Sequence, residues 1–187
     1  MEEELEKALK VLKKGGVILY PTDTVWGIGC DATNTKAVSK IIKIKQREKI
    51  KSLIILIENE KDLNKYLKEV PYQAFDLMAS NQKPLTIIYY GARGLASNVI
   101  HEDGSIGIRV VKDEFCLKLI RQLGKPIVST SANISGEGTP KNFKEISMHI
   151  LKEVDYIVNL RQTELLSGKA STIIKLDKNG EVKIIRK

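Results

Sequence analysis

The sequence predicts an α/β protein with a large, twisted, mixed sheet flanked by helices. Short apolar runs such as 17–20 and 53–57 recur along the chain, and segments with apolar residues at helical spacing lie between them. The 187 residues and the hydrophobic content of 42% suit one folded domain, which we expect to span residues 1–187. No repeat, low-complexity tract or long linker divides the chain.

The first elements follow from periodicity and from turn residues. A helix is expected over 3–14, where apolar residues recur at helical spacing, and Gly15-Gly16 ends it. The strand at 17–20 stops at Pro21, and a polar loop follows through Thr24. Another apolar stripe predicts a helix that runs into a basic cluster, with members Ala37, Val38, Ile41 and Ile42.

The same reasoning places the remaining elements. Helices are expected at 60–69, 71–80, 113–123 and 142–153. Strands are expected at 53–57, 85–90, 105–110, 126–130, 155–159, 171–176 and 181–186. The segment 132–140 is rich in Gly, Ser and Asn and follows a strand, so it should lie at a strand's carboxyl end, where α/β sheets bind ligands.

Composition excludes several functional classes. No apolar run is long enough to span a bilayer, and the acidic start Met1-Glu2-Glu3-Glu4 is unlike a signal peptide, so no membrane partner and a cytoplasmic location are expected. Cys30 and Cys116 lie far apart and should be reduced, partly buried thiols. With two isolated histidines, the chain offers almost nothing for a metal site built from protein ligands.

The net charge of +8 is concentrated in one window. Between Lys36 and Lys51 seven cations face one acid, Glu48, which leaves a local charge of +6. The window is either the solvated face of a lysine-rich helix or a site for polyanions, which means phosphates or RNA.

The first motif, Tyr20-Pro21-Thr22-Asp23-Thr24-Val25-Trp26-Gly27, places two hydroxyls and a carboxylate in a loop after a buried strand. Such a loop can bind a small polar ligand. On spacing alone, the alternative is favoured, namely a turn in which Asp23 or Thr22 caps the backbone.

The second motif, Lys43-Ile44-Lys45-Gln46-Arg47, brings cations together in either conformation. In a helix Lys43 and Arg47 share a face, whereas in an extended chain Lys45 and Arg47 do. Arginine supplies a planar fork for phosphate oxygens and lysine a point charge.

The third motif is an apolar strand that opens into Ser129-Thr130-Ser131-Ala132-Asn133-Ile134-Ser135-Gly136. Alternation predicts Ser129 and Ser131 on one side and Thr130 on the other. Small hydroxyls and backbone amides suit a phosphate cradle, and the alternative is a polar turn.

Further polar residues lie on predicted strands. Ser105 and Arg109 should share a face of one strand, and a buried Arg109 would need a partner. Ser171 and Thr172 open another strand, and Arg186 closes the last. Neither a G-x-x-x-x-G-K-[ST] loop nor a G-x-G-x-x-G fingerprint is present, so a nucleotide would be bound outside the common nucleotide folds.

Four motifs in this order resemble the YrdC-like threonylcarbamoyl-AMP synthases. They are P-T-D-T-V-W-G from 21, K-Q-R from 45, S-T-S-A-N-I-S-G from 129 and S-T from 171, and the resemblance covers about Gly15 to Arg186. It implies the single-domain form of an open, twisted sheet with a basic concave surface. It also implies an enzyme, a nucleotidyltransferase that makes threonylcarbamoyl-AMP and pyrophosphate from L-threonine, bicarbonate and ATP. A downstream threonylcarbamoyl transferase would then modify tRNA.

The resemblance also implies residue roles. Catalytic cations would be Lys45 and Arg47. ATP contacts would come from Lys45, Arg47, Ser105, Ser131, Asn133, Thr139 and Arg186. Threonine contacts would come from Thr22 or Thr24, Arg109, Ser129 and Ser171, with Arg109 on the threonine carboxylate. Mg²⁺ would accompany ATP through phosphates and water, without a protein metal site.

The sequence departs from the family pattern at loop positions. Glu48 and Ser52 stand where the family usually has proline, and Val111-Lys112 replaces another frequent proline. The S-A-N triplet argues against the related YciO-type branch. Two alternatives stay open: an RNA-binding module for tRNA or double-stranded RNA, and a related enzyme that forms another carbamoyl adenylate on the same fold.

Overall fold

The computed structural model describes residues 1–46, 53–164, 166 and 170–187. Its helices are α1 (Glu2–Lys13), α2 (Thr35–Ile44), α3 (Leu63–Tyr66), α4 (Gln73–Ser80), α5 (Glu114–Leu123) and α6 (Met148–Glu153). Short 3₁₀ turns are η1 (Glu60–Asp62), η2 (Ser97–Val99) and η3 (Phe143–Glu145). The strands are β1 (Ile18–Pro21), β2 (Trp26–Gly29), β3 (Ile54–Ile57), β4 (Leu85–Tyr90), β5 (Ser105–Val110), β6 (Ile127–Ser131), β7 (Tyr156–Ile157), β8 (Thr172–Leu176) and β9 (Val182–Arg186).

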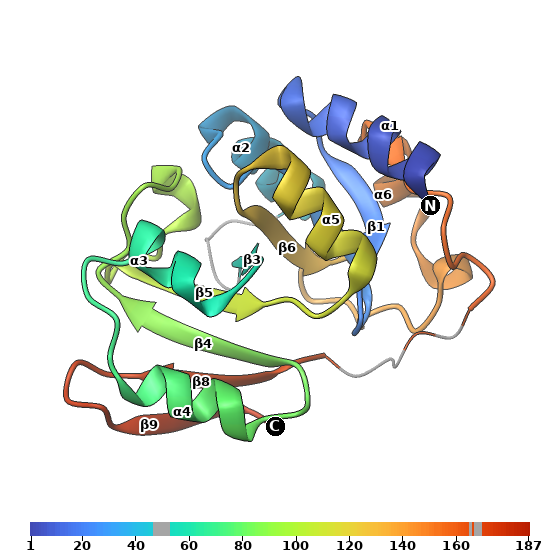
Figure 1. The fold of residues 1–187 in the computed structure, drawn as a ribbon. Coiled ribbons are helices and arrows are strands. Elements are labelled where there is room, and N and C mark those ends of the chain that lie inside the picture. The colour runs from blue at the N-terminus through green and yellow to red at the C-terminus, as the bar shows by residue number, and fades with distance from the viewer. Residues whose placement is uncertain (47–52, 165, 167–169) are drawn as a thin grey trace.

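All the strands of the described residues belong to one mixed sheet in the order β7-β1-β2-β6-β3-β5-β4-β8-β9 (Figure 1). Three neighbouring pairs are parallel, namely β1–β7, β3–β5 and β4–β8. The other five pairs are antiparallel. The fold is therefore the mixed α/β sheet that the sequence predicts.

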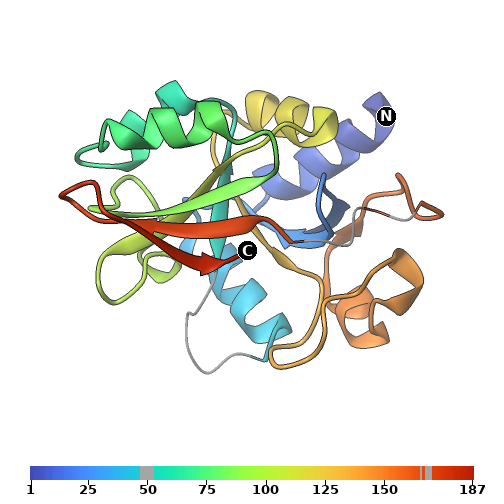
Figure 2. The ribbon, with the colours of Figure 1, turned by 90° about the horizontal axis from the view of Figure 1, so that it is seen from below.

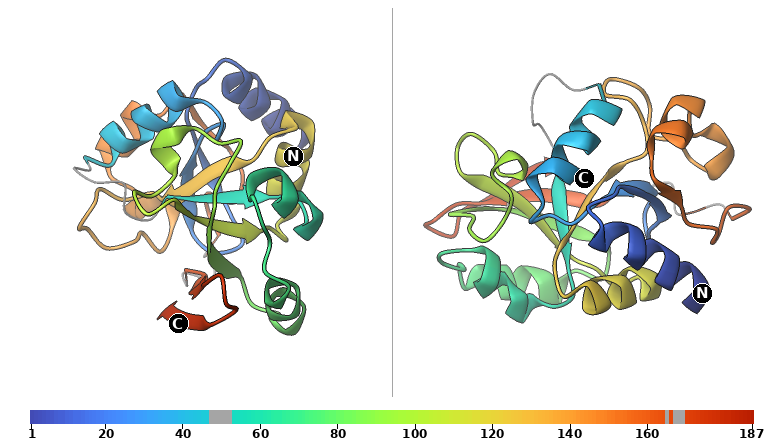
Figure 3. Two further views of the ribbon diagram at one scale, coloured as in Figure 1. Left: turned by 90° about the vertical axis from the view of Figure 1, so that its left-hand side faces the viewer. Right: turned by 90° about the horizontal axis from the view of Figure 1, so that it is seen from above.

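Helices cover both faces of the sheet (Figure 2). On one face α1 packs against α5, and their buried side chains form one apolar cluster with β1. On the other face α2 lies beside α6 and contributes its apolar stripe to the second, larger cluster (Figure 3). Side chains cap three of these helices: Asn34 accepts bonds from the first turn of α2, Asp113 does so for α5 and Ser147 for α6.

Most expected strands and helices are present within two residues of their predicted bounds, but some predictions are wrong. The helix expected at 60–69 is only η1 and α3, and that expected at 142–153 is η3 and α6 with a break between them. Pro21 was expected to lie just after the first strand, but it is the last residue of that strand. Strand β2 was not predicted, because it is only four residues long and two of them, Gly27 and Gly29, have low strand propensity.

The sheet is curved enough to bring distant strands to one cavity. Gly27 of β2 and Arg186 of β9 both line it, although five strands separate β2 from β9 in the sheet order. The curvature makes residues from opposite halves of the sheet neighbours in space.

Among the described residues, no helix is both long enough and apolar enough to cross a membrane.

Candidate functional site

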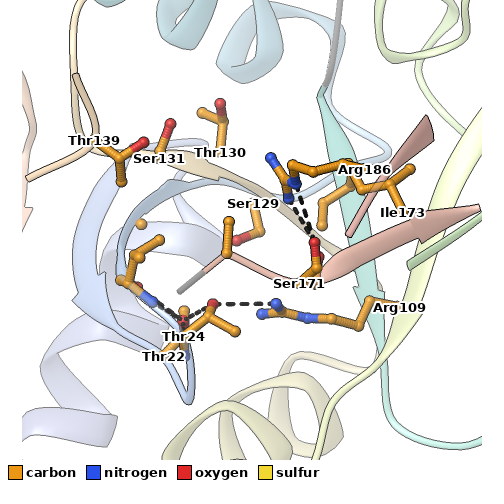
Figure 4. Close-up of a pocket in the computed structure, with 14 residues that line it drawn as sticks. Thr22, Thr24, Arg109, Ser129, Thr130, Ser131, Thr139, Ser171, Ile173 and Arg186 are labelled. Carbon is orange, nitrogen blue, oxygen red and sulfur yellow. Dashed lines mark hydrogen bonds between the residues drawn. The ribbon is translucent and has the colours of Figure 1, made fainter. Parts of the chain in front are cut away.

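A cavity of about 110 Å³ opens where β2, β3, β5, β6, β8 and β9 converge (Figure 4). Hydroxyl and guanidinium groups dominate its wall, with a few apolar side chains. Eight of the residues expected from the sequence line it: Thr22, Thr24, Arg109, Ser129, Ser131, Thr139, Ser171 and Arg186. Residues far apart in the sequence thus meet in one polar cavity, the arrangement of a small-molecule site.

The loop between β1 and β2 is held by the hydroxyl of Thr22. Its Oγ1 accepts bonds from the amides of Thr24 and Val25, at 3.1 and 3.2 Å, and donates to the Val25 carbonyl at 2.7 Å. The Thr24 Oγ1 lies 2.9 Å from the Thr22 Oγ1. The turn in which Thr22 caps the backbone is therefore confirmed, and this turn carries both hydroxyls into the cavity wall.

Arg109 is a buried cation at the same wall, with 3% of its side chain exposed. It lies on β5 between β3 and β4, so its guanidinium cannot reach bulk water easily. Its Nη1 donates to Thr24 Oγ1 at 3.2 Å, and its Nη2 forms an ion pair with Asp23 Oδ1 at 3.3 Å. The Nε makes no hydrogen bond in the part of the chain that the structure describes.

The carboxylate of Asp23 is therefore the counter-ion of Arg109 in the structure. The sequence suggested a capping role for Asp23, whereas the structure gives it an ion pair with a residue of another strand. Asp23 Oδ1 accepts no hydrogen bond from the described residues, so the contact is electrostatic rather than a directional bond. A buried arginine with only a loosely aligned partner keeps capacity for a second anion.

Ser171 joins the two ends of the cavity. Its hydroxyl lies 2.8 Å from Thr86 Oγ1, and both residues are buried. Its carbonyl accepts two bonds from Arg186, from Nε at 3.1 Å and from Nη2 at 2.8 Å. Figure 4 shows Ser171 between the two arginines. Thr86 is a site residue that the sequence did not reveal, because nothing in its own segment points to Ser171.

The positive charges of Arg109 and Arg186 make the cavity favourable for anions. Burial and, after it, the charge of Arg109 lower the pKa of Arg186. The two guanidinium groups therefore repel each other across the site. An anion between them would relieve that repulsion and replace lost solvation.

The carboxyl end of β6 forms the opposite wall. The alternation of strand side chains put Thr130 away from Ser129 and Ser131, but all three residues line the cavity. Strand β6 ends at Ser131, and the cavity follows the chain around that end. Facing this wall, a Cβ on Gly27 would lie 3.3 Å from Ser129 Oγ, so glycine leaves room there.

Lys45 lies next to this wall but does not line the cavity. It caps the end of α2 and is 1% exposed. Its Nζ donates to the carbonyls of Ser131 and Asn133, at 2.6 and 2.7 Å. The Asn133 side chain donates in turn to the carbonyls of Ile134 and Glu137. Lys45 therefore joins the end of α2 to the loop after β6, and Asn133 folds that loop.

Ser105 begins β5, four residues before Arg109, and lies outside the cavity. It donates to Asp103 Oδ1 at 2.5 Å and lies 3.1 Å from His101 Nδ1. Lys175 bonds the other Asp103 oxygen at 3.1 Å and stacks on the Tyr90 ring. The bond from Ser105 is the main cause that lowers the pKa of Asp103 to about 2.

The basic window is only partly described. Arg47 and the departures Glu48 and Ser52 fall outside the described residues, as do Lys49 and Lys51. On α2, Lys36 and Lys43 are exposed, whereas Lys40 pairs with Asp155 at 2.6 Å. Lys40 is thus committed to an ion pair within the fold.

Two further expectations concern cysteines and metals. Cys30 and Cys116 are free and buried, as predicted. Among the described residues, no group of three or more His, Cys, Asp or Glu side chains could hold a metal ion. The described cavity wall therefore does not offer a cage for Mg²⁺.

Fold and site together define a class: an α/β protein with a cavity lined by hydroxyl and guanidinium groups at the carboxyl end of a sheet strand. The family model Sua5_yciO_yrdC, described as "Telomere recombination", matches residues 10–187. The chain belongs to the Sua5/YciO/YrdC family.

Two curated relatives carry an activity in their names. The chain is 32% identical to the threonylcarbamoyl-AMP synthase of Pseudoalteromonas translucida, over 97% of each chain. It is 33% identical to the threonylcarbamoyl-AMP synthase of Vibrio cholerae, over 83% of this chain and 85% of the relative.

Solved structures match over the whole fold. A variant of P. abyssi Sua5 has a TM-score of 0.89 and 27% identity and covers all of this chain. P. abyssi Sua5 complexed with L-threonine has a TM-score of 0.81 and 27% identity over 94% of this chain. The chain spans about half of those Sua5 chains, 56% and 52%. E. coli YciO has a TM-score of 0.86 and 27% identity, over all of this chain and 90% of YciO.

Proposed function

We propose that the chain is a threonylcarbamoyl-AMP synthase, which forms threonylcarbamoyl-AMP and pyrophosphate from L-threonine, bicarbonate and ATP. The names of the curated relatives support this activity. The L-threonine complex of the structurally similar Sua5 supports the amino-acid substrate. Within this chain, one observation carries the proposal: Arg109 and Arg186 border one cavity and share it with hydroxyl groups.

The reaction needs such a site because every substrate is anionic or becomes so. The threonine amine adds to the carbon of bicarbonate-derived CO₂ and loses a proton, which gives an N-carboxylate. An oxygen of this carboxylate then forms a bond to the α-phosphorus of ATP, and the bond from that phosphorus to pyrophosphate breaks. Transfers of this kind depend on positioning and on positive charge rather than on a covalent side-chain intermediate.

The threonine end of the site is proposed around Arg109. Its guanidinium would bind the threonine carboxylate. That carboxylate would pair with Arg109 either together with Asp23 or in place of Asp23. The Thr24 hydroxyl lies in the same wall as Arg109, Ser129 lines the opposite wall, and Ser171 lies between Arg109 and Arg186. We assign the hydroxyl contact to Thr22 or Thr24, because both residues line the cavity and their hydroxyl groups bond to each other.

The nucleotide end is proposed around Arg186, Ser131 and Thr139, which line the cavity away from Arg109. Arg186 has Nη1 left for a phosphate oxygen, since its Nε and Nη2 donate to Ser171. Four more residues would join when ATP binds: Lys45, Arg47, Ser105 and Asn133. Catalytic stabilisation of the transferred phosphate is assigned to the cations Lys45 and Arg47.

Mg²⁺ would enter with the triphosphate, held by phosphate oxygens and water, because the described wall supplies no cage for it. The product is a mixed anhydride, so a downstream transferase that acts on tRNA would consume it. Direct contact of tRNA or double-stranded RNA with this chain would use the exposed cations Lys36 and Lys43.

The test is pyrophosphate release from ATP by the purified chain. We expect release only when L-threonine and bicarbonate are both present, and the nucleotide product should have the mass of threonylcarbamoyl-AMP. Equal release with either substrate omitted would exclude the proposed reaction. Tight RNA binding without threonine-dependent release would favour an RNA-binding module instead.

A further inference from the structure

The last strand, β9, is an open edge of the sheet. It ends the strand order and pairs only with β8, so one side of its backbone has no partner strand among the described residues. In Figure 2, β9 lies at the margin of the β4–β8–β9 layer. Open edges are the surfaces to which extended peptides add as further strands.

The side chains of β9 are unusually apolar for an exposed edge. Val182, Ile184 and Ile185 are 46%, 55% and 50% exposed. Val182 and Ile184 pair with the buried Leu176 and Ile174 of β8. They therefore extend the apolar face of the sheet outward to solvent, where an added strand could bury them.

Lys183 stands between Val182 and Ile184 in the chain, and Ile185 directly follows Ile184. Lys183 pairs with Lys175 of β8 and so lies on the opposite face from Val182 and Ile184. Arg186 ends the strand, the exposed Lys187 follows it, and one acid, Glu181, precedes it. A strand added to this edge thus meets apolar groups on one face and positive charge on the other.

The charges decide between possible occupants. A second copy of β9 would bring the cations of both strands into one ladder, and like charges on adjacent strands are destabilising. A strand of opposite charge would instead be stabilised by the same cations. We propose that β9 is the docking edge for an extended segment of a partner protein, in which apolar residues alternate with Asp or Glu.

The docking edge ends at the cavity. Arg186 is both the last residue of β9 and a residue of the cavity wall, where it holds the Ser171 carbonyl. A strand bound along β9 would therefore order the backbone that positions Arg186. Binding at the β9 edge depends only on that edge and its charges, and it does not depend on the proposed reaction.

The experiment uses the whole chain and a short acetylated, amidated peptide that alternates valine and glutamate. Backbone amide NMR spectra are recorded during titration, and amide exchange of 182–186 is followed. We expect shift changes to centre on β9 and exchange there to slow. The same peptide with lysine in place of glutamate should bind more weakly, by about two- to fivefold for each charge pair lost.

Charge reversal at one exposed position sharpens the test. Lys183→Glu should weaken binding of the glutamate peptide and strengthen binding of the lysine peptide. It should not lower the melting temperature, because it replaces a like-charge pair with Lys175 by an opposite-charge pair. Lys36→Glu makes the same change in net charge on α2, far from β9, and should alter neither affinity.

Three results would overturn the proposal. One is that neither peptide affects β9. The second is that Lys36→Glu acts as strongly as Lys183→Glu, because binding would then follow net charge alone. The third is that protection of β9 grows with protein concentration without any peptide, because the edge would then pair with a second copy.

Discussion

Arg109 and Arg186 face the same cavity from β5 and β9, and Ser171 lies between them, bonded through its carbonyl to Arg186. Burial and, after it, the charge of Arg109 lower the pKa of Arg186, so the two guanidinium groups repel each other. An anion between them reduces that repulsion, so the pair favours binding of anionic substrates.

Arg109→Lys should raise the KM for L-threonine. Lysine keeps the charge but loses the planar fork, and the loss of a charged hydrogen bond costs about 1.5–3 kcal/mol, or roughly 10- to 150-fold. Pyrophosphate release at varied threonine concentration measures the change. Arg121→Lys is the matched control, since Arg121 pairs with Glu58 at the surface and should leave the KM unchanged.

The same variant tests what Arg109 binds. Threonine without its carboxylate should be a very poor substrate for the wild type, and Arg109→Lys should change its turnover little. If the carboxylate-free amine reacts as well as threonine, Arg109 does not anchor the carboxylate.

Local signals in the sequence predicted most of the fold. The apolar runs of β1, β4 and β5 and the helical stripes of α1 and α5 each lie within one segment. Strand β2 could not be predicted this way. A Cβ on Gly29 would lie 2.6 Å from the Val128 carbonyl and 2.7 Å from Tyr20, so its glycines reflect close tertiary approach rather than local preference.

The site was predictable as a set of residues but not as a set of contacts. The motifs placed hydroxyls and cations after strands, and the sheet brings eight of them to one cavity. The partners of these residues depend on strand order, which no local pattern encodes. Asp23 with Arg109, Thr86 with Ser171, and Lys45 with the Ser131 carbonyl each join segments at least 85 residues apart.

Lys45→Met should affect both ATP binding and stability. The sequence alone predicts a loss of nucleotide affinity with an unchanged melting temperature. The structure shows Nζ bonded to the Ser131 and Asn133 carbonyls, so removal of the ammonium loses two charge-assisted bonds to part-buried acceptors and costs about 1–3 kcal/mol of stability. Calorimetry with ATP and thermal melting measure the two effects, with the exposed Lys43→Met as control.

The two effects separate two roles for Lys45. A lower melting temperature with normal ATP affinity would mean that Lys45 only holds the loop after β6. Weaker ATP binding with a normal melting temperature would mean that its carbonyl bonds contribute nothing.

Asp103 should stabilise the fold in a defined pH range. Its pKa is lowered to about 2, from the ordinary value of 3.8, mainly by the Ser105 bond and also by Lys175. Stability from Asp103 is therefore fully present above about pH 4 and is lost as the pH falls through about 2. Asp103→Asn should unfold at lower denaturant than wild type near neutral pH, and the difference should shrink in acid.

The control for Asp103 is its exposed neighbour Glu102. Glu102→Gln should leave the unfolding midpoint unchanged at every pH, because Glu102 makes no hydrogen bond or ion pair with described residues. A difference between wild type and Asp103→Asn that stays constant into acid would contradict the assigned protonation behaviour.

Serine should be a poor but detectable substrate. It lacks only the threonine methyl group, and one missing methyl in an apolar contact lowers kcat/KM by about 10- to 200-fold, or 1–3 kcal/mol. Val25, Ile54 and Ile173 supply the apolar part of the cavity wall that such a methyl group could contact. Pyrophosphate release with each amino acid gives the ratio. Equal kcat/KM values would mean that no wall residue contacts the methyl group.

Thr86→Val should weaken threonine binding without a direct contact to substrate. Valine has nearly the same shape, but it removes the 2.8 Å contact that holds the buried Ser171 hydroxyl. We expect a loss of about 1 kcal/mol in stability and a rise of several-fold in the KM for threonine, with a smaller change in kcat. Thr86→Ser keeps the hydroxyl and should restore the KM although it removes a buried methyl group. If Thr86→Ser raises the KM as much as Thr86→Val does, packing rather than the bond to Ser171 positions the site.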